Sequence, residues 1–128
     1  PESRLALVTG DGSLGFNFME INTAIRYGMH FVIVVCNDAS WGMIRHSQQL
    51  RFGKAFDFVA WLGVTPYHKM VESMGGAGFL VEDPKDIRPA LDEAFASKKV
   101  ACVNVLADPE IISPASTSLS KLGAYKAK

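Results

Sequence analysis

Short apolar runs alternate along the chain with segments in which apolar residues recur every three or four positions. The apolar runs predict strands at residues 5–9, 31–36 (FVIVVC), 79–81 and 100–106 (VACVNVL). The longer spacing predicts helices at residues 14–27, 41–49, 65–74 and 83–97, the last two opened by Thr65-Pro66 and Asp83-Pro84. A continuously apolar run such as 31–36 is typical of a parallel strand covered on both faces. The alternation therefore predicts an α/β fold, a three-layer domain with a mostly parallel sheet and helices on both faces.

Two segments fit neither period. Residues 51–63 are aromatic and irregular, and their aromatic side chains are more typical of a core or subunit contact than of a substrate channel, although both interpretations stay open. Residues 108–128 are rich in Ser, Ala, Pro and Lys. We therefore expect a domain over residues 1–107 and a separate tail over 108–128. Because the first strand begins almost at once, we also expect the sequence to be a fragment of a longer polypeptide.

Composition excludes several classes of protein. The 128 residues are 48% hydrophobic and carry 13 basic and 13 acidic side chains, which is typical of one globular domain. The absence of a basic cluster predicts no nucleic-acid partner and no anionic membrane surface. The longest apolar run, 31–36, is far shorter than the ~20 residues of a membrane span. Cys36 and Cys102 lie in predicted buried strands, so we interpret them as inert thiols of a reducing compartment, the cytoplasm.

The candidate chemistry follows the first two strands. Gly10-Asp11-Gly12-Ser13-Leu14-Gly15 fits the G-x-G-x-x-G pattern of dinucleotide-binding loops, and Asn37-Asp38 follows the second strand. Ligands of open α/β sheets bind beyond the carboxyl ends of the strands. If these strands are neighbours, ~5 Å apart, Asp11 and Asp38 reach one small ligand.

Three interpretations of these carboxylates compete. In a dinucleotide site the glycine loop holds a pyrophosphate and Asp38, 23 residues after Gly15, binds a ribose hydroxyl. Alternatively, both are ordinary turn aspartates. In the third interpretation both bind a divalent cation that bridges to a diphosphate, because Mg²⁺ prefers hard oxygen ligands. Without a cation, a carboxylate beside a phosphate in a partly dry cleft is strongly unfavourable. Asp11 inside a phosphate loop thus favours a metal.

The order Gly10-Asp11-Gly12-Ser13, followed by Asn37-Asp38 with 24 residues between Gly12 and Asn37, resembles the diphosphate-binding signature of thiamine diphosphate (ThDP) enzymes. The similarity continues through Ile25-Arg26-Tyr27-Gly28 and Trp41-Gly42-Met43-Ile44 and covers most of the chain. It is greatest to the acetohydroxyacid (acetolactate) synthase and 2-hydroxyacyl-CoA lyase branch. The resemblance implies an acetolactate synthase-like carboligase or lyase, which makes or breaks C–C bonds next to a carbonyl. Its substrates would be 2-oxo acids or 2-hydroxyacyl-CoA compounds.

The resemblance also implies a site. The metal, Mg²⁺, would be held by the side chains of Asp11 and Asp38 and by the main-chain carbonyl of Ser40. The implied cofactor-binding residues are Gly10, Asp11, Gly12, Ser13, Asp38, Ser40, Trp41, Gly42, Met43 and Ile44. Asp38 stands where the family usually has Asn, which leaves the metal preference open. Ile44 replaces the acidic residue of some ThDP decarboxylases, which favours a carboligase or lyase over aldehyde release.

Partners are implied in the same way. The family's activating glutamate belongs to a pyrimidine-binding domain of the same or a second subunit, so we expect a homo-oligomer and a fragment that is inactive alone. No residue of this chain is a candidate for that catalytic role. The tail, residues 115–128, is either a lid over the site or disordered. The alternatives are an NAD-type oxidoreductase domain, which would bind without metal, and a cofactor-free regulatory domain of the same fold.

Three further side chains are candidates beside the site. Arg45 and Arg51 are interpreted as possible anion clamps for a carboxylate or CoA phosphate, or as ordinary surface arginines. His46 is expected to be a half-exposed helix histidine, with a substrate-facing role as the alternative.

Overall fold

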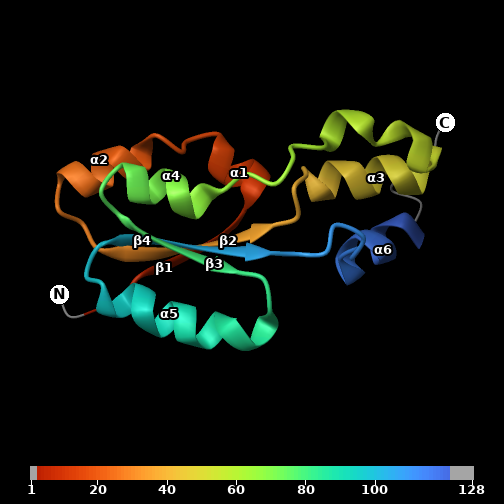
Figure 1. The fold of residues 1–128 in the computed structure, drawn as a ribbon. Helices are drawn as coiled ribbons and strands as arrows, with labels where there is room; N and C mark the ends of the chain where they lie inside the picture. Colours follow the sequence, from red (N-terminus) through yellow and green to blue (C-terminus); the bar gives the residue numbers. More distant parts are fainter. Residues whose placement is uncertain (1–2, 122–128) are drawn as a thin grey trace.

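The computed structural model describes residues 3–121 and contains a four-stranded sheet with helices on both faces (Figure 1). The strands are β1 (Ala6–Gly10), β2 (Phe31–Asn37), β3 (Ala77–Val81) and β4 (Val100–Leu106). The helices are α1 (Asp11–Gly15), α2 (Glu20–Arg26), α3 (Gly42–Phe52), α4 (Tyr67–Ser73), α5 (Ile87–Ala96) and α6 (Pro114–Lys121). All strand pairs are parallel, in the order β1-β2-β4-β3, which confirms the predicted three-layer α/β class.

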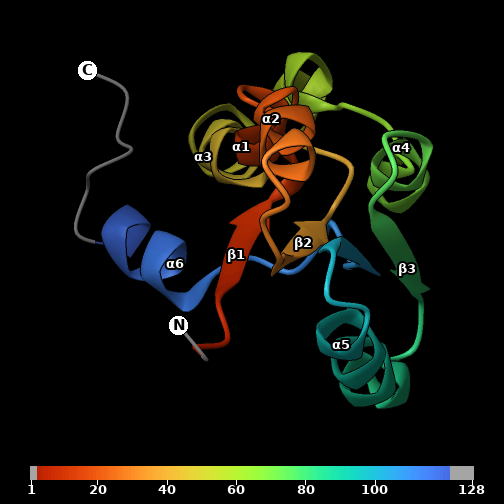
Figure 2. The same cartoon turned by 90° about the vertical axis from the view of Figure 1, so that its left-hand side faces the viewer.

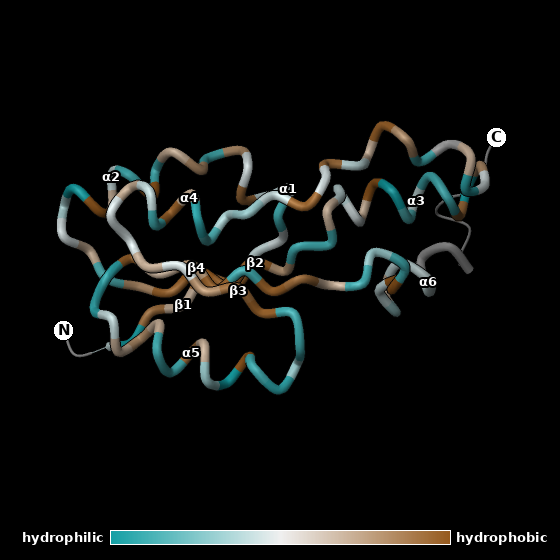
Figure 3. The backbone as a smooth tube through the Cα atoms, in the orientation of Figure 1, coloured by the Kyte–Doolittle hydropathy of each residue, from teal (hydrophilic) through white to brown (hydrophobic). Residues whose placement is uncertain are grey.

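The layers separate two cores. Helices α1, α2 and α4 cover one face of the sheet and α5 covers the other (Figure 2). In the first core, Ile33, Val35 and Cys102 pack with residues of α1, α2 and α4. In the second core, Val32 and Val103 pack with residues of α5. The strands accordingly form the hydrophobic centre of the backbone trace in Figure 3. Burial of alternate residues on both faces explains why β2 and β4 are apolar except at Asn37 and Asn104.

The carboxyl ends of β1 and β2 point away from this core, toward α3 and α6 (Figure 1). The register pairs Gly10 with Cys36, so the loops after β1 and β2 leave the sheet side by side. β1 is an edge strand of the sheet, and Leu5 and Val8 are 63% and 68% exposed. The sheet thus brings the two predicted chemical segments to one place.

Several local predictions were wrong. The helix predicted over 14–27 is two helices, because hydrogen bonds from Phe16 to Ser13 and from Asn17 to Leu14 close tighter turns between them. Gly15 and Asn17, both poor helix formers, favour that break. The helix predicted over 83–97 opens with a 3₁₀ turn, Pro84–Asp86, before α5.

The cysteine prediction was right for Cys102 and wrong for Cys36. Cys102 is buried, and burial raises the pKa of its thiol to about 12. Cys36 is exposed, because the end of β2 faces an open hollow instead of a helix. Both thiols are free.

The remaining segments are more ordered than expected. Residues 51–63 contain the end of α3 and two 3₁₀ turns, Lys54–Phe56 and Phe58–Ala60. Part of the predicted tail forms α6, while residues 122–128 of the proposed lid lie outside the described part of the chain. Between residues 3 and 121, no helix has the length and apolarity to cross a membrane.

Candidate cofactor-binding site

A hollow of about 830 Å³ lies at the carboxyl ends of β1 and β2. All ten residues predicted to bind the cofactor line it: Gly10, Asp11, Gly12, Ser13, Asp38, Ser40, Trp41, Gly42, Met43 and Ile44. Phe16, Cys36 and Ser113 complete the wall and were not predicted. The structure therefore brings the predicted set together, while the roles of its members stay predictions.

Asp11 is a buried acid at the start of α1. Its side chain is 2% exposed, and Oδ1 accepts a hydrogen bond of 2.9 Å from the backbone N–H of Gly12. The other oxygen, Oδ2, is buried and has no hydrogen-bond partner among the described residues. Burial raises the pKa of Asp11 above its ordinary 3.8, the Gly12 N–H opposes this, and the charge of Asp38 raises the pKa further. A buried carboxylate oxygen without a partner is rare unless a cation or water binds it.

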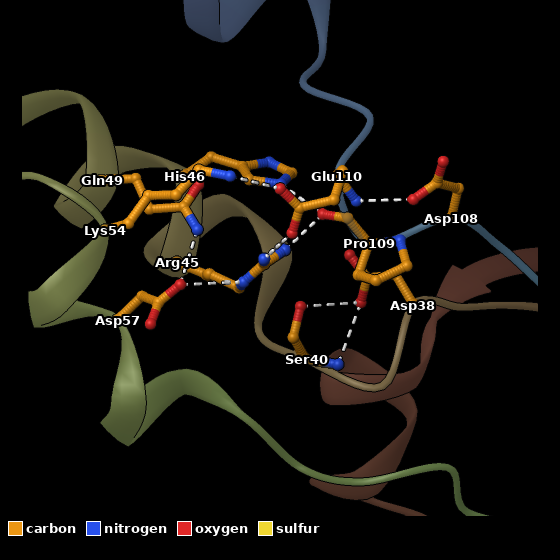
Figure 4. A network of polar contacts seen from close by, with 10 residues as sticks. All are labelled: Asp38, Ser40, Arg45, His46, Gln49, Lys54, Asp57, Asp108, Pro109 and Glu110. Atoms are coloured by element: carbon orange, nitrogen blue, oxygen red, sulfur yellow. Dashed lines mark hydrogen bonds and ion pairs between the residues drawn. The ribbon is translucent and has the colours of Figure 1, made fainter.

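Asp38 occupies the turn after β2. Its Oδ1 accepts hydrogen bonds from the backbone N–H of Ser40, at 3.0 Å, and from the Ser40 hydroxyl, at 3.1 Å (Figure 4). Its Oδ2 lies against Gly42. Ala39, between Asp38 and Ser40, adopts a φ of 58°, a conformation that costs a non-glycine residue of order 1 kcal/mol. The Asp38 carboxylate is thus aimed by its own turn.

Trp41 forms the wall opposite the glycine loop. A Cβ atom on Gly12 would lie 2.2 Å from Cδ1 of Trp41, so only glycine allows this approach. The Trp41 ring stacks on Phe16 with 6.1 Å between centroids, and its backbone N–H donates to the carbonyl of Ala60 at 2.8 Å. This wall holds the loop after β1 against the start of α3.

The donor set fits a hard divalent cation. Asp11, Asp38 and Ser40 all line one hollow, Asp11 Oδ2 has no hydrogen-bond partner among the described residues, and carboxylate and main-chain oxygens suit Mg²⁺. Within residues 3–121, no cluster of three or more His, Cys, Asp or Glu side chains is placed to hold a metal. A cation here would therefore complete its coordination with main-chain oxygen, water or a ligand phosphate.

Arg45 and His46 do not line the hollow. Arg45 is 2% exposed, and its Nε lies 3.2 Å from Asp57. The same guanidinium donates to the carbonyl of Pro109 and to Glu110 (Figure 4). It also lies 4.0 Å from the centroid of the Trp61 ring. Arg45 is therefore not free to act as an anion clamp.

The His46 prediction was also wrong, because the side chain is 5% exposed instead of half exposed. Its Nε2 lies 2.9 Å from the carbonyl oxygen of Pro109. Both side chains thus hold residues 109–110, which lead from β4 to Ser113 and α6.

Residues 1–105 match the family model described as "Thiamine pyrophosphate enzyme, C-terminal TPP binding domain". The chain belongs to this family, as its fold and the arrangement of its two acidic loops indicate. The cofactor of the family is thiamine diphosphate, bound with a divalent metal ion. This confirms the resemblance inferred from Gly10-Asp11-Gly12 and Asn37-Asp38.

Individual relatives of the chain include acetolactate synthases and 2-hydroxyacyl-CoA lyases. The chain is 39% identical over 121 residues to the acetolactate synthase large subunit IlvG of Mycobacterium tuberculosis, covering 94% of this chain and 22% of that protein. It is 37% identical over 113 residues to a 2-hydroxyacyl-CoA lyase of Arabidopsis thaliana, covering 85% and 20%. The chain spans about a fifth of the length of these relatives.

A solved structure shows the same fold. The thiamine diphosphate-dependent 4-hydroxybenzoylformate decarboxylase of Rhodococcus jostii RHA1 superimposes with a TM-score of 0.75 at 19% identity, over 84% of this chain and 20% of that one.

Sequence reasoning missed the residues behind the two acidic loops. Tyr67 donates its hydroxyl hydrogen bond to the main-chain carbonyl of Asp11, at 3.2 Å. Asn104, in the middle of β4, accepts a 3.1 Å hydrogen bond from Asn37. The signal for Asn104 was present, since it is the one polar residue in the run VACVNVL. Tyr67 gave no signal, because nothing in the sequence places α4 beside the glycine loop.

Proposed function

We propose that the chain binds the diphosphate of ThDP through Mg²⁺, as part of an acetolactate synthase-like carboligase or lyase. The observation that carries this proposal is that Asp11 lines the same hollow as Asp38 and that its buried Oδ2 has no hydrogen-bond partner within residues 3–121. Two carboxylates in a partly dry hollow repel each other, and a divalent cation turns that repulsion into attraction. Asp11, Asp38 and the Ser40 carbonyl are the proposed metal ligands.

The other lining residues have complementary proposed roles. Gly10, Gly12 and Ser13 offer the diphosphate a close approach to backbone and hydroxyl groups. Trp41, Gly42, Met43 and Ile44 form the wall next to the reacting part of the cofactor. When bound, the cofactor supplies the electron sink for cleaving or forming a C–C bond beside a carbonyl. The apolar Ile44 holds no proton to deliver, which supports a carboligase or lyase over an aldehyde-releasing decarboxylase.

A second domain completes this site in our proposal. Phe16, Met43 and Phe58 are apolar side chains with 72% or more of their surface exposed, and Val59 and Val64 are also exposed. Such a surface favours contact with another protein domain. We propose a pyrimidine-binding domain of the same or a second subunit as its partner, in a homo-oligomer. The substrate would be a 2-oxo acid or 2-hydroxyacyl-CoA, and the two free thiols agree with a reducing compartment such as the cytoplasm.

Calorimetry on the intact protein tests the metal-dependent role. ThDP binding is expected with Mg²⁺, to be lost in EDTA, and to be lost in Asp11→Ala. Asp92→Ala, at a side chain that is 59% exposed on α5, is the matched control and should bind as the wild type does. Binding of NAD that persists in EDTA would instead establish the dinucleotide alternative.

A further inference from the structure

The loops that carry Asp11 and Asp38 rest on one segment, Thr65–His68, which leads into α4 and opens it. The carbonyl of Thr65 accepts hydrogen bonds from Asn37 Nδ2, at 3.0 Å, and from the backbone N–H of Tyr67, at 3.0 Å. The Tyr67 hydroxyl reaches the other loop, at the main-chain carbonyl of Asp11. The segment Thr65–His68 therefore forms hydrogen bonds with both acidic loops.

Tyr67 holds the backbone of Asp11 and leaves its carboxylate free. The side chain is 6% exposed and its ring packs against Phe18, with 5.7 Å between centroids. Its hydroxyl donates to the Asp11 main-chain carbonyl at 3.2 Å, whereas Asp11 Oδ2 stays without a partner in the described chain. The contact thus fixes where the acid sits without neutralising it.

Asn37 and Asn104 do the same for the second loop. Asn104 is fully buried in β4, and its Oδ1 accepts from Asn37 Nδ2 at 3.1 Å. Asn37 Oδ1 in turn accepts from the backbone N–H of Ala39 at 3.1 Å, which fastens the residue whose φ is 58°. A buried asparagine is costly unless its polar atoms are paired, and Asn104 Nδ2 also lies 3.3 Å from His68 Nδ1.

We propose that Tyr67 and Asn104 are positioning residues for the cation, holding the two acidic loops together before it binds. This inference rests on the proposed metal-dependent function. Two like-charged loops on flexible supports would separate in the metal-free protein, and closing them again would cost part of the binding free energy. The shared support on Thr65–His68 removes that cost. Groups that orient metal ligands typically change metal affinity by 10–100-fold when they are removed.

The test is a calorimetric titration of the intact protein with Mg²⁺ in the presence of ThDP. Tyr67→Phe deletes one oxygen and keeps the packed ring, and we expect it to raise the dissociation constant of Mg²⁺ about 10-fold. Asn104→Leu, which keeps the approximate volume, should act in the same direction. Tyr27→Phe, at a side chain that is 75% exposed, is the matched control and should leave the constant unchanged. At saturating Mg²⁺ the ThDP affinity of Tyr67→Phe should return to that of the wild type.

The outcomes separate the two proposals. If Tyr67→Phe lowers the melting temperature but leaves the Mg²⁺ dissociation constant unchanged, Tyr67 is only structural and the inference is overturned. If Asn104→Leu does not fold, Tyr67→Phe alone decides. If the wild type binds no ThDP–Mg²⁺ at all, the proposed function fails, whatever the variants do.

Discussion

Asp38 Oδ2 lies where a side chain at position 42 would have to be: a Cβ atom on Gly42 would be 2.2 Å from this oxygen. Gly42 is the first residue of α3, and alanine is a better helix former than glycine, by about 1 kcal/mol in a helix interior. The glycine is therefore explained by the carboxylate and not by the helix. Its absence of a side chain lets Asp38 keep the orientation that Ser40 gives it.

We predict that Gly42→Ala weakens Mg²⁺-dependent ThDP binding by about 10-fold or more while leaving stability nearly unchanged. The added methyl group displaces the Asp38 carboxylate, and the better helix propensity offsets the strain. Calorimetric titration and thermal unfolding measure the two effects. Gly15→Ala is the matched control, because a Cβ at Gly15 meets nothing within 4 Å. Equal affinity in both variants would contradict the proposed role of Asp38.

Asp11 should make the metal-free protein less stable as pH rises. Its pKa is raised in the folded state, mainly by burial, so the folded protein holds this proton more tightly than the unfolded chain. Ionisation above the unfolded value of 3.8 therefore favours unfolding, until the pH passes the raised pKa. In EDTA, Asp11→Asn should gain stability relative to the wild type as the pH rises above 3.8, until the pH passes the raised pKa of Asp11.

Urea denaturation at several pH values gives this difference, and comparison with the wild type cancels other titrating groups. With saturating Mg²⁺ and ThDP the order should reverse, because only the wild type gains binding free energy. If the stability difference between Asp11→Asn and the wild type does not vary with pH, the pKa of Asp11 is not raised in the folded protein.

The fold, and the placement of Asp11 and Asp38 in one hollow, were predictable because both follow from short-range sequence patterns. Alternating strands and helices specify a parallel sheet, and parallel strands gather their carboxyl ends at one edge. The supports of the site were not predictable in this way. Asn104 is a conspicuous polar residue in an apolar strand, yet its partners Asn37 and His68 lie 67 and 36 residues away. Nothing local identifies them.

The errors have the same cause. Arg45 was interpreted as an anion clamp or an ordinary surface arginine, but its acceptors, Asp57 and Glu110, come from segments 12 and 65 residues later. Cys36 was predicted buried from the apolarity of β2, but a strand's composition does not say how far its covering helix extends. Tertiary contacts decided both outcomes.

Arg45 should be among the most sensitive positions for stability. Replacing it with methionine keeps a long apolar side chain but removes the charge that Asp57, 14% exposed, and Glu110 share. We predict a loss of about 3 kcal/mol, at the lower end for breaking a buried ion pair because Glu110 is half exposed. Urea denaturation measures it. Arg88→Met is the control: its pair with Asp92 is exposed and joins neighbouring turns of α5, so the variant should lose less than about 0.5 kcal/mol.

The ion pairs of Glu110 with Arg45 and Lys54 should be lost in acid. Hydrogen bonds from Lys54 and then from Arg45 lower the pKa of Glu110 from 4.5 to about 2. Because the folded pKa is the lower one, the stabilisation is complete above pH 4.5 and is lost as the pH falls through about 2. Glu110→Gln should therefore be less stable than the wild type at neutral pH and approach it near pH 2.

Acid titration of the unfolding free energy, in the wild type and in Glu110→Gln, measures the window. Lys54→Met removes the larger cause of the pKa shift and should reproduce part of the Glu110→Gln effect. Because Lys54 is 79% exposed and Glu110 51% exposed, high salt should weaken the Lys54 contribution more than that of the buried Arg45. If Glu110→Gln is as stable as the wild type at every pH, residues 109–110 are held by the contacts of Arg45 and His46 with the Pro109 carbonyl alone.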